Sequence, residues 1–386
     1  MSGTPGAPSA GGLASWLEGR RVALVHDWLT GMRGGEKVLE SICRLFPTTD
    51  LVTLVHVPGA VSPVIERRHI RTSLIQRLPY PARLYRHYLP LFPAAIELLD
   101  FDDVDLVIST SHCAAKAVIA RRQAVHLCYC HTPMRYVWDQ FDAYFGVERV
   151  GRWPSTAARR MAAWLARWDR DTARRVTRFV ANSQHVAGRI ARFYNRPATV
   201  LHAPVDTSFF TPGSAETDGS FLVVSALVPY KRVEIAIRAA AAVGVGLKIV
   251  GTGPDNARLR AMAGPTVEFL GSLSDEALRD AYRAARALVL PGEEDFGIAP
   301  IESLACGRPV IALGRGGACE TIETGVTGLL VGEPRAEAFA QAMRDVASRT
   351  YEPAALRAQA ERFSTGRFEA SFREVLADTL MTDAEW

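Results

Sequence analysis

The stretch ALVLPGEEDFGIAPIE, residues 287–302, runs from a short apolar strand through a loop into the first turns of a helix. Pro300 fits the first turn, where a residue without an N–H loses no hydrogen bond. Glu294 in the loop and Glu302 in the helix place one carboxylate on each side of the helix start. The N–H groups between them lie at the positive end of the helix dipole and belong to Phe296, Gly297, Ile298 and Ala299. This pattern predicts a phosphate site flanked by acceptors for sugar hydroxyls; the alternative is two charges without a ligand.

The same alternation of apolar strand and helix recurs along nearly the whole chain. These runs are too continuously apolar for half-exposed strands, which indicates parallel sheets covered by helices on both faces. We therefore predict an α/β fold with two Rossmann-like, doubly wound domains facing a central cleft. In such sheets ligands bind beyond the carboxyl ends of the strands. The predicted strands are 22–28, 51–57, 106–110, 124–130, 178–183, 221–227, 247–251, 267–271, 287–292, 309–313 and 329–332.

A length of 386 residues suits two domains of this kind. We expect a flexible tail over residues 1–20, one Rossmann-like domain over 21–205 and a second Rossmann-like domain over 206–363. Residues 364–386 would form a C-terminal helix that could pack back on the N-terminal domain. The prolines and the acidic, glycine-containing segment between about 200 and 219 suggest the connection between domains.

The composition is typical of a soluble globular protein, with 48% hydrophobic and 22% charged residues. No apolar run approaches the roughly 20 residues that span a bilayer, and the first twenty residues lack the basic start and apolar core of a signal peptide. The six cysteines show no CxxC pair or zinc spacing, so we expect reduced packing residues. These features favour a cytoplasmic protein.

Basic residues are concentrated in two segments although the net charge is only +4. Residues 66–90 hold six arginines and one acid, and residues 152–178 hold eight arginines and two aspartates, both with apolar and aromatic neighbours. This mixture suits an anionic membrane surface or a phosphate-bearing partner. The alternative is a pair of amphipathic helices with solvated outer faces. Nucleic acid is not expected as a partner, because no recognised binding motif accompanies the charge.

Lys231 in SALVPYKRVEIAIRAA, residues 225–240, lies where a strand has ended and a helix is starting. A cation at that point opposes the helix dipole, unless a bound phosphate reverses the electrostatic balance. The chain has only four lysines among its 45 basic residues, which makes a generic surface charge a weaker explanation. The alternative remains a solvated basic turn.

Further candidates follow other strands. Gly34 and Gly35 separate the first strand from its helix and allow close backbone approach to a phosphate. Gly251 opens the segment GTGP after another strand, and the glycines of RGGACE at 315–320 repeat the arrangement. Tight turns would explain these glycines almost equally well. His131 stands at the carboxyl end of a strand, where a functional and a structural role are about equally expected.

The aspartates between Asp100 and Asp105 resemble the metal-binding carboxylate pairs that one class of sugar transferases uses. They precede the strand at 106–110 and so belong at the edge of the sheet opposite the predicted site. We therefore expect solvated turn residues, no catalytic metal and no other cofactor.

Taken together, these segments resemble the GT-B-fold retaining glycosyltransferases of family 4, and most nearly the bacterial mannosyltransferases of O-antigen and exopolysaccharide synthesis. The resemblance covers nearly the whole chain after the tail. Its motifs are HDWLTGMRGGEKVLE, CYCHTPMRYVWD, NSQHVAGRI, SALVPYKRVEIAI, GTGP, VEFLGSLSDEAL and EEDFGIAPIESLACGRPVIA. It implies a nucleotide-diphosphate-sugar donor bound by the C-terminal domain and an acceptor bound by the N-terminal domain.

The resemblance also implies residue roles. Lys231 would neutralise the diphosphate, Glu302 would bind the ribose, and Glu294 would hold the donor sugar. Gly35 would approach the diphosphate, and His131 would lie near the transferred sugar. We therefore expect catalytic roles for Lys231, Glu294 and His131.

One position departs from the family pattern. Many members carry an arginine where this chain has Ala226, which removes one phosphate contact. Arg232 is the candidate to replace it as a donor-binding residue.

The predicted reaction is transfer of a hexose, with mannose from GDP-mannose as the expected donor, to a lipid-linked oligosaccharide or glycan acceptor. It would take place at the cytoplasmic face of the inner membrane, with peripheral attachment. The departing diphosphate would take the acceptor proton, with retention at the anomeric carbon. Two alternatives stay open, a GT-B-fold sugar-nucleotide epimerase and a non-catalytic nucleotide-sugar-binding protein.

Overall fold

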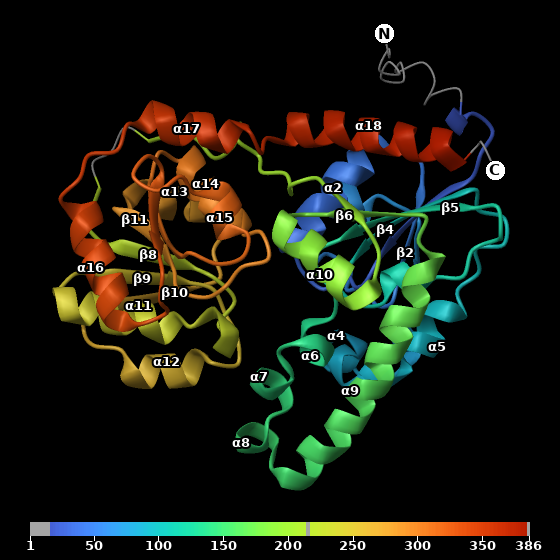
Figure 1. Ribbon diagram of the computed structural model, residues 1–386, viewed down its shortest axis with the longest axis horizontal. Coiled ribbons are helices and arrows are strands. Elements are labelled where there is room, and N and C mark those ends of the chain that lie inside the picture. Colours follow the sequence, from blue (N-terminus) through green and yellow to red (C-terminus); the bar gives the residue numbers. More distant parts are fainter. Residues whose placement is uncertain (1–15, 214–216, 384–386) are drawn as a thin grey trace. The chain divides into compact units, whose positions relative to one another are not determined.

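The computed structural model describes residues 16–213 and 217–383. The chain forms two compact units (Figure 1): unit 1 comprises residues 1–202 and 366–386, and unit 2 comprises residues 203–365. The predicted tail lies outside the described residues up to position 15. Each unit contains one parallel sheet, so the prediction of two Rossmann-like α/β domains is confirmed.

Unit 1 is built on a seven-stranded sheet in the order β3-β2-β1-β4-β5-β6-β7, with every neighbouring pair parallel. Its central strands are buried along their whole length, because helices cover both faces. The strands are β1 (Val22–His26), β2 (Asp50–Thr53), β3 (Ile70–Thr72), β4 (Leu106–Ser111), β5 (Val125–Cys130), β6 (Arg178–Ala181) and β7 (Ala198–Val200).

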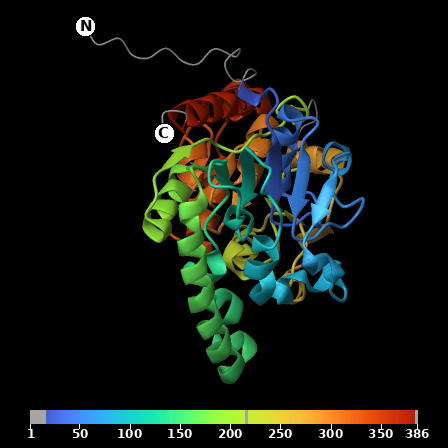
Figure 2. The same ribbon diagram turned by 90° about the vertical axis from the view of Figure 1, so that its right-hand side faces the viewer.

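The helices of unit 1 differ greatly in length. The longest projects away from the sheet, with two short helices beside its outer part (Figures 1 and 2). The helices are α2 (Gly34–Leu45), α3 (Pro63–Glu66), η1 (Leu74–Arg77), α4 (Pro81–Leu84), η2 (Tyr85–Leu91), α5 (Phe92–Glu97), η3 (Ala115–Ala117), α6 (Arg135–Trp138), α7 (Phe141–Phe145), α8 (Val147–Val150), α9 (Arg152–Thr172), η4 (Ala173–Arg175), α10 (Gln184–Tyr194) and α18 (Thr365–Asp383).

Unit 2 is built on a six-stranded parallel sheet in the order β10-β9-β8-β11-β12-β13. The strands are β8 (Phe221–Val224), β9 (Leu247–Val250), β10 (Val267–Gly271), β11 (Ala287–Leu290), β12 (Val310–Leu313) and β13 (Gly328–Val331). The helices are η5 (Pro229–Lys231), α11 (Val233–Val243), α12 (Asn256–Met262), α13 (Asp275–Ala284), α14 (Ile298–Ala305), α15 (Ala318–Thr321), α16 (Ala336–Ala347) and α17 (Pro353–Glu361). Helices α11 and α16 pack together over a core that includes Val223, Ile249 and Val289.

Both sheets change winding direction at one place. In unit 1 the chain runs outward from β1 through β2 to β3, then returns to β4 on the other side of β1. In unit 2 the same change lies between β8 and β11. Connections leave the two strands at such a switch toward opposite faces, which opens a crevice beyond their carboxyl ends. The topology therefore specifies one candidate site in each unit.

The chain returns to unit 1 through α18. Phe368 of α18 packs against Tyr129 of β5 with ring centroids 5.8 Å apart, and Asp378 forms an ion pair with Arg178 of β6. Phe368 and Phe372 are both buried. Helix α18 is thus part of the packing of unit 1.

The alternative reading of the two basic segments as amphipathic helices is wrong for residues 66–90. That segment forms β3 and the short helices η1, α4 and η2, because Pro79, Pro81 and Pro90 interrupt any longer helix. Residues 152–172 do form one helix, α9. Across the described ranges, no helix is both long and apolar enough to cross a membrane.

Candidate functional site

The switch between β8 and β11 brings Lys231 and Glu294 together. Lys231 closes the short helix η5 after β8, Glu294 lies in the loop after β11, and their side chains form an ion pair. The two side chains are only 14% and 15% exposed. A cation and a carboxylate from different loops therefore share one partly buried position at the carboxyl edge of this sheet.

Gly292 makes this close approach possible. A Cβ atom added there would lie 2.7 Å from both the Lys231 Cα and the Tyr230 carbonyl oxygen. Any side chain would push the loop after β11 away from the turn that holds Lys231. Gly292 was not among the predicted site residues, although it lies directly after an apolar strand in the sequence.

Glu302 lies in α14 and is buried, with 4% of its surface exposed. Its Oε2 accepts a hydrogen bond of 2.8 Å from the Tyr282 hydroxyl of α13. Burial, together with the Glu302 carboxylate, raises the pKa of Tyr282 well above its usual range, so the phenol remains a donor. Tyr282 therefore fixes this carboxylate, a contact that the sequence did not reveal.

The segment between the two glutamates starts α14 at Ile298, followed by Ala299 and Pro300. Gly297 caps the helix with φ +85°, a conformation that favours glycine. The Phe296 ring is buried and packs against Phe363 with centroids 5.7 Å apart. Its side chain is therefore a core group, which leaves only the backbone of Phe296 for a ligand role.

Three further predicted positions surround the turn at Lys231. The Gly251 N–H donates to the Gly271 carbonyl at 2.7 Å, and a Cβ at Gly251 would lie 1.9 Å from the Ser225 oxygen, so this glycine is needed for loop packing. Arg232 donates through Nε to Glu234 at 2.8 Å. Ala226 is exposed, with no side chain to contact a phosphate.

The switch between β1 and β4 gathers three histidines in unit 1. His26 ends β1, His112 follows β4, and His131 follows β5. The His131 ring centroid lies 6.5 Å from that of His26 and 6.2 Å from that of His112. A Cβ added at Gly35, in the first turn of α2, would lie 3.5 Å from His131 Nε2 and 3.6 Å from His26 Cε1. Gly34 begins the same helix.

Asp27 organises the loop after β4. Its fully buried carboxylate accepts backbone N–H bonds from His112, Cys113, Ala114 and Ala115, at 2.6 to 2.9 Å. The same carboxylate pairs with His112 Nδ1 at 3.0 Å. Burial alone would raise the pKa of Asp27, but the interactions with His112 hold it well below its usual range. Asp27 therefore remains an anion at the switch point.

His131 and His26 differ from His112. Burial, together with the neighbouring His112 and His26, lowers the pKa of His131 to about 3, so its ring is neutral near pH 7. The Nε2 atoms of His26 and His131 are buried and have no hydrogen-bond partner within the described ranges. His26 Nδ1 contacts the Thr110 hydroxyl at 2.7 Å. His26 Nε2 lies 3.8 Å from Glu36 Oε1 of α2, whereas His131 Nε2 lies beside Gly35 at the start of α2.

Family comparisons agree with this division of the chain. Residues 32–209 match the model of Glycosyltransferase Family 4, and residues 205–363 match that of Glycosyl transferases group 1. We refer to these two matched regions as the Family 4 domain and the group 1 domain. The Family 4 match includes His112 and His131 of unit 1, whereas His26 precedes it. The group 1 match includes the Lys231–Glu294 pair of unit 2.

Curated relatives are similar over part of the chain. A D-inositol 3-phosphate glycosyltransferase of Mycolicibacterium smegmatis is 34% identical over 211 residues, which are 48% of this chain and 48% of that protein. Its counterpart in Actinosynnema mirum is 33% identical over 203 residues, covering 44% of this chain and 49% of that protein. The chain therefore spans about half the length of the curated relatives it matches.

Solved structures match over nearly the whole chain. Anabaena HepE in complex with UDP-glucose aligns with a TM-score of 0.68 at 19% identity, over 92% of this chain and 99% of that chain. The sucrose-phosphate synthase of Thermosynechococcus elongatus aligns with a TM-score of 0.70 at 18% identity, over 94% of this chain and 100% of that one. These likenesses and the two parallel sheets show that the fold is GT-B α/β.

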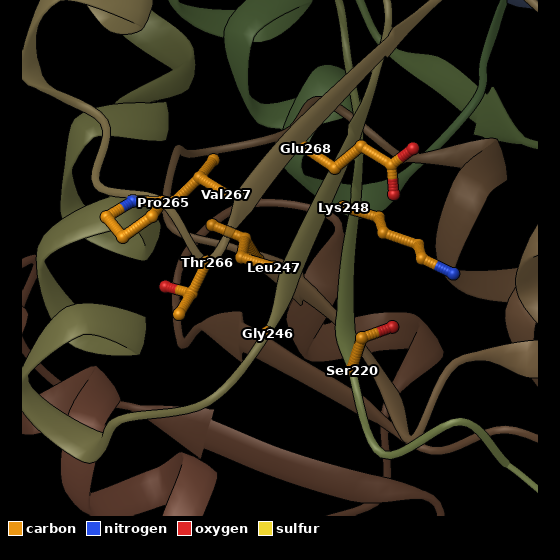
Figure 3. Close-up of a pocket in the computed structure, with 8 residues that line it drawn as sticks. All are labelled: Ser220, Gly246, Leu247, Lys248, Pro265, Thr266, Val267 and Glu268. Carbon is orange, nitrogen blue, oxygen red and sulfur yellow. The ribbon is translucent and has the colours of Figure 1, made fainter.

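A cavity of about 450 Å³ lies at the opposite edge of the group 1 sheet (Figure 3). It is lined by the amino-terminal parts of β9 and β10, including Lys248 and Glu268. It is thus remote from the loops that hold Lys231 and Glu294.

The aspartates 100–105 also lie at an amino edge, that of the Family 4 sheet. Asp105 accepts the Arg21 N–H at 2.8 Å and pairs with Arg121. Within residues 16–213 and 217–383, no three His, Cys, Asp or Glu side chains are grouped to hold a metal ion.

Proposed function

We propose that this protein is a retaining glycosyltransferase that uses a nucleotide-diphosphate sugar. The observation that carries the proposal is the Lys231–Glu294 pair at the switch point of the group 1 domain, beside the start of α14. In a parallel α/β sheet this is where a phosphate-bearing ligand binds. The group 1 domain would therefore hold the donor, and the Family 4 domain would hold the acceptor.

The donor diphosphate gains negative charge as its bond to the anomeric carbon breaks. Lys231 and the N–H groups at the start of α14 would stabilise that charge where it develops, which is the most effective form of electrostatic catalysis. Glu294, already paired with Lys231, would accept hydrogen bonds from the donor sugar. A ribose hydroxyl would contact Glu302, whose orientation Tyr282 fixes. The leaving phosphate would take the acceptor proton.

For the donor we propose a hexose, with mannose from GDP-mannose as the candidate from family resemblance. HepE was solved with UDP-glucose, and the curated relatives are named for D-inositol 3-phosphate. UDP-sugars and phosphorylated acceptors therefore belong in the same screen as GDP-mannose and lipid-linked glycans.

The direct test is incubation with labelled nucleotide sugars, with and without acceptors, in the presence of EDTA. We expect sugar transfer that survives the chelator, because Lys231 and the helix start supply the positive charge for the diphosphate. Loss of transfer in EDTA that magnesium or manganese restores would contradict the metal-independent site. Conversion of donor to an epimer, without acceptor, would instead support an epimerase; binding without turnover would support a nucleotide-sugar sensor.

We also propose peripheral attachment to anionic membranes through unit 1. On α9, the residues Trp153, Ala157, Arg160, Trp164 and Arg167 follow a spacing of four and three and are all exposed. This spacing places them on one face of the helix. Trp153 is 85% and Trp164 is 42% exposed. Alternating tryptophan and arginine on one face suits the boundary between lipid headgroups and acyl chains.

Vesicle co-sedimentation tests this attachment. Each arginine near an anionic leaflet contributes about 1 kcal/mol, so changing Arg77, Arg83 and Arg86 to glutamine should weaken binding roughly a hundredfold. A variant with Arg160 and Arg167 changed to glutamine should lose roughly tenfold or more by the same arithmetic. Binding should also fall with salt, since the Debye length shrinks from about 10 Å at 0.1 M to about 3 Å at 1 M.

The control changes Arg258 and Arg335 of unit 2, which pair with acidic neighbours. Their replacement by glutamine should leave sedimentation unchanged. Equal binding of wild type to neutral and anionic vesicles would contradict the membrane proposal.

A further inference from the structure

His112 has a buried and an exposed side. Its Nδ1 is committed to the Asp27 carboxylate at 3.0 Å, while 31% of the side chain remains exposed. The ring packs edge-on against Trp28 with centroids 4.4 Å apart. Since Nδ1 faces the buried Asp27, the exposed edge of the ring carries Nε2. A protonated His112 would present that N–H at a fixed position.

The charges around His112 favour its protonated form. Burial lowers the pKa of His112, but the Asp27 carboxylate outweighs that effect and raises it. Glu36 of α2 acts in the same direction, and Arg33 acts against it. The His131 ring, after β5, lies 6.2 Å from the His112 ring, and the His26 ring at the end of β1 lies 6.5 Å from that of His131. The Asp27 carboxylate accepts four backbone hydrogen bonds within the protein. An anion that binds at the site therefore contacts the His112 imidazolium and not an unpaired carboxylate.

The surroundings of His112 also fit a phosphoryl group. The 12-residue helix α2 starts at Gly34 and Gly35, so its first N–H groups and dipole favour an anion. His26 is fully buried, and its Nε2 has no hydrogen-bond partner within the described residues. His131 contributes a second such nitrogen beside Gly35. The site thus combines a cation, a helix start and the neutral imidazole of His131 within one unit.

We propose that His112, oriented and charged by Asp27, is a phosphoryl-binding residue of the Family 4 domain. The ligand is a phosphate oxygen that accepts a hydrogen bond from His112 Nε2. It belongs either to the donor diphosphate or to a phosphate on the acceptor. The inference rests on the proposed function, because that reaction supplies such groups. Neither the sequence motifs nor the family resemblance gave His112 a role.

The test compares wild type with His112→Gln in the full-length protein. Isothermal titration with inorganic phosphate, UDP and inositol 3-phosphate measures binding directly. Loss of a hydrogen bond to a charged group should weaken affinity roughly tenfold to a hundredfold for the ligand that His112 contacts. A loss confined to UDP identifies the donor diphosphate, and a loss confined to inositol 3-phosphate identifies an acceptor phosphate. Unchanged affinity for all three ligands would overturn the proposal.

Proton NMR of the His112 ring separates binding from a structural role. Phosphate bound to the imidazolium should raise the pKa of His112, because the anion stabilises the charged form. The affinity for phosphate should correspondingly fall as pH rises through that pKa. A His112 titration that phosphate leaves unmoved would overturn the proposal even if the variant bound more weakly.

His69→Gln is the matched control, because His69 also pairs with a carboxylate, Asp50, at 3.2 Å, but at the amino edge of the same sheet. It should leave all three affinities unchanged. The donor site is tested separately with Lys231→Ala, which should weaken UDP binding. Retained UDP affinity in that variant would count against the proposed function, whereas retained phosphate affinity in His112→Gln counts only against the role of His112.

Discussion

Replacing Lys116 with methionine should lower the free energy of unfolding of unit 1 by about 3–5 kcal/mol. The Lys116 ammonium is 1% exposed and lies 3.0 Å from the fully buried Asp169 carboxylate. It also donates to the Asp169 carbonyl at 2.6 Å and to the Thr172 hydroxyl at 3.0 Å. The variant would leave the Asp169 charge buried beside an apolar side chain, with no cation to balance it.

Urea unfolding followed by tryptophan fluorescence measures this effect in the intact chain. All seven tryptophans belong to the sequence ranges of unit 1, so the signal reports that unit alone. The matched control is Arg159→Met in the same unit, which removes an exposed pair with Asp142 and should cost less than about 1 kcal/mol. Adding Asp169→Asn to the Lys116 variant should restore much of the loss. Equal effects of the Lys116 and Arg159 variants would contradict a buried ion pair.

Replacing Lys231 with alanine should remove about 2–4 kcal/mol of transition-state stabilisation, comparable to the loss of one oxyanion donor. This corresponds to a fall in kcat of roughly 30- to 1000-fold. Two effects contribute, since the diphosphate loses its cation and Glu294 loses its partner next to a negatively charged donor. Steady-state transfer with saturating donor measures the change.

Lys248→Ala is the control, because Lys248 lies in the same sheet but lines the amino edge. Its kcat should equal that of wild type. Circular dichroism should be unchanged in both variants. A Lys231→Ala protein with undiminished turnover would mean that the diphosphate binds elsewhere.

The sequence was sufficient to predict the central strands of both sheets, because they are continuous apolar runs that alternate with helices. The edge strands β3 and β7 were missed, because each is only three residues long and partly exposed. It also placed His131, Lys231 and Glu294 at strand ends, through the rule that ligands bind beyond the carboxyl edge. The same rule applied to HDW at 26–28 and to STSH at 109–112 would have singled out Asp27 and His112. The positions of Asp27 and His112 at strand ends were therefore visible in the sequence, but neither residue was predicted.

Other side-chain contacts could not be predicted from the sequence. Lys116 and Asp169 are 53 residues apart, and no local periodicity indicates which buried acid faces which lysine. The hydroxyl of Tyr282 reaches Glu302 across two helices, so only the packed structure reveals it. Arg232 was a candidate to replace the arginine missing at Ala226, but its bond to Glu234 depends on the left-handed backbone at φ +52°.

The return of the chain to unit 1 through α18 has a consequence for synthesis on the ribosome. Domains usually fold in order as they emerge, the N-terminal one first. Here the first unit to be started is the last to be finished, because Phe368, Phe372 and Leu376 cover it only after all of unit 2 has been translated. Until α18 is synthesised, the sheet of unit 1 lacks the apolar side chains that cover it. Unit 2 is synthesised later but is complete in sequence before unit 1 is.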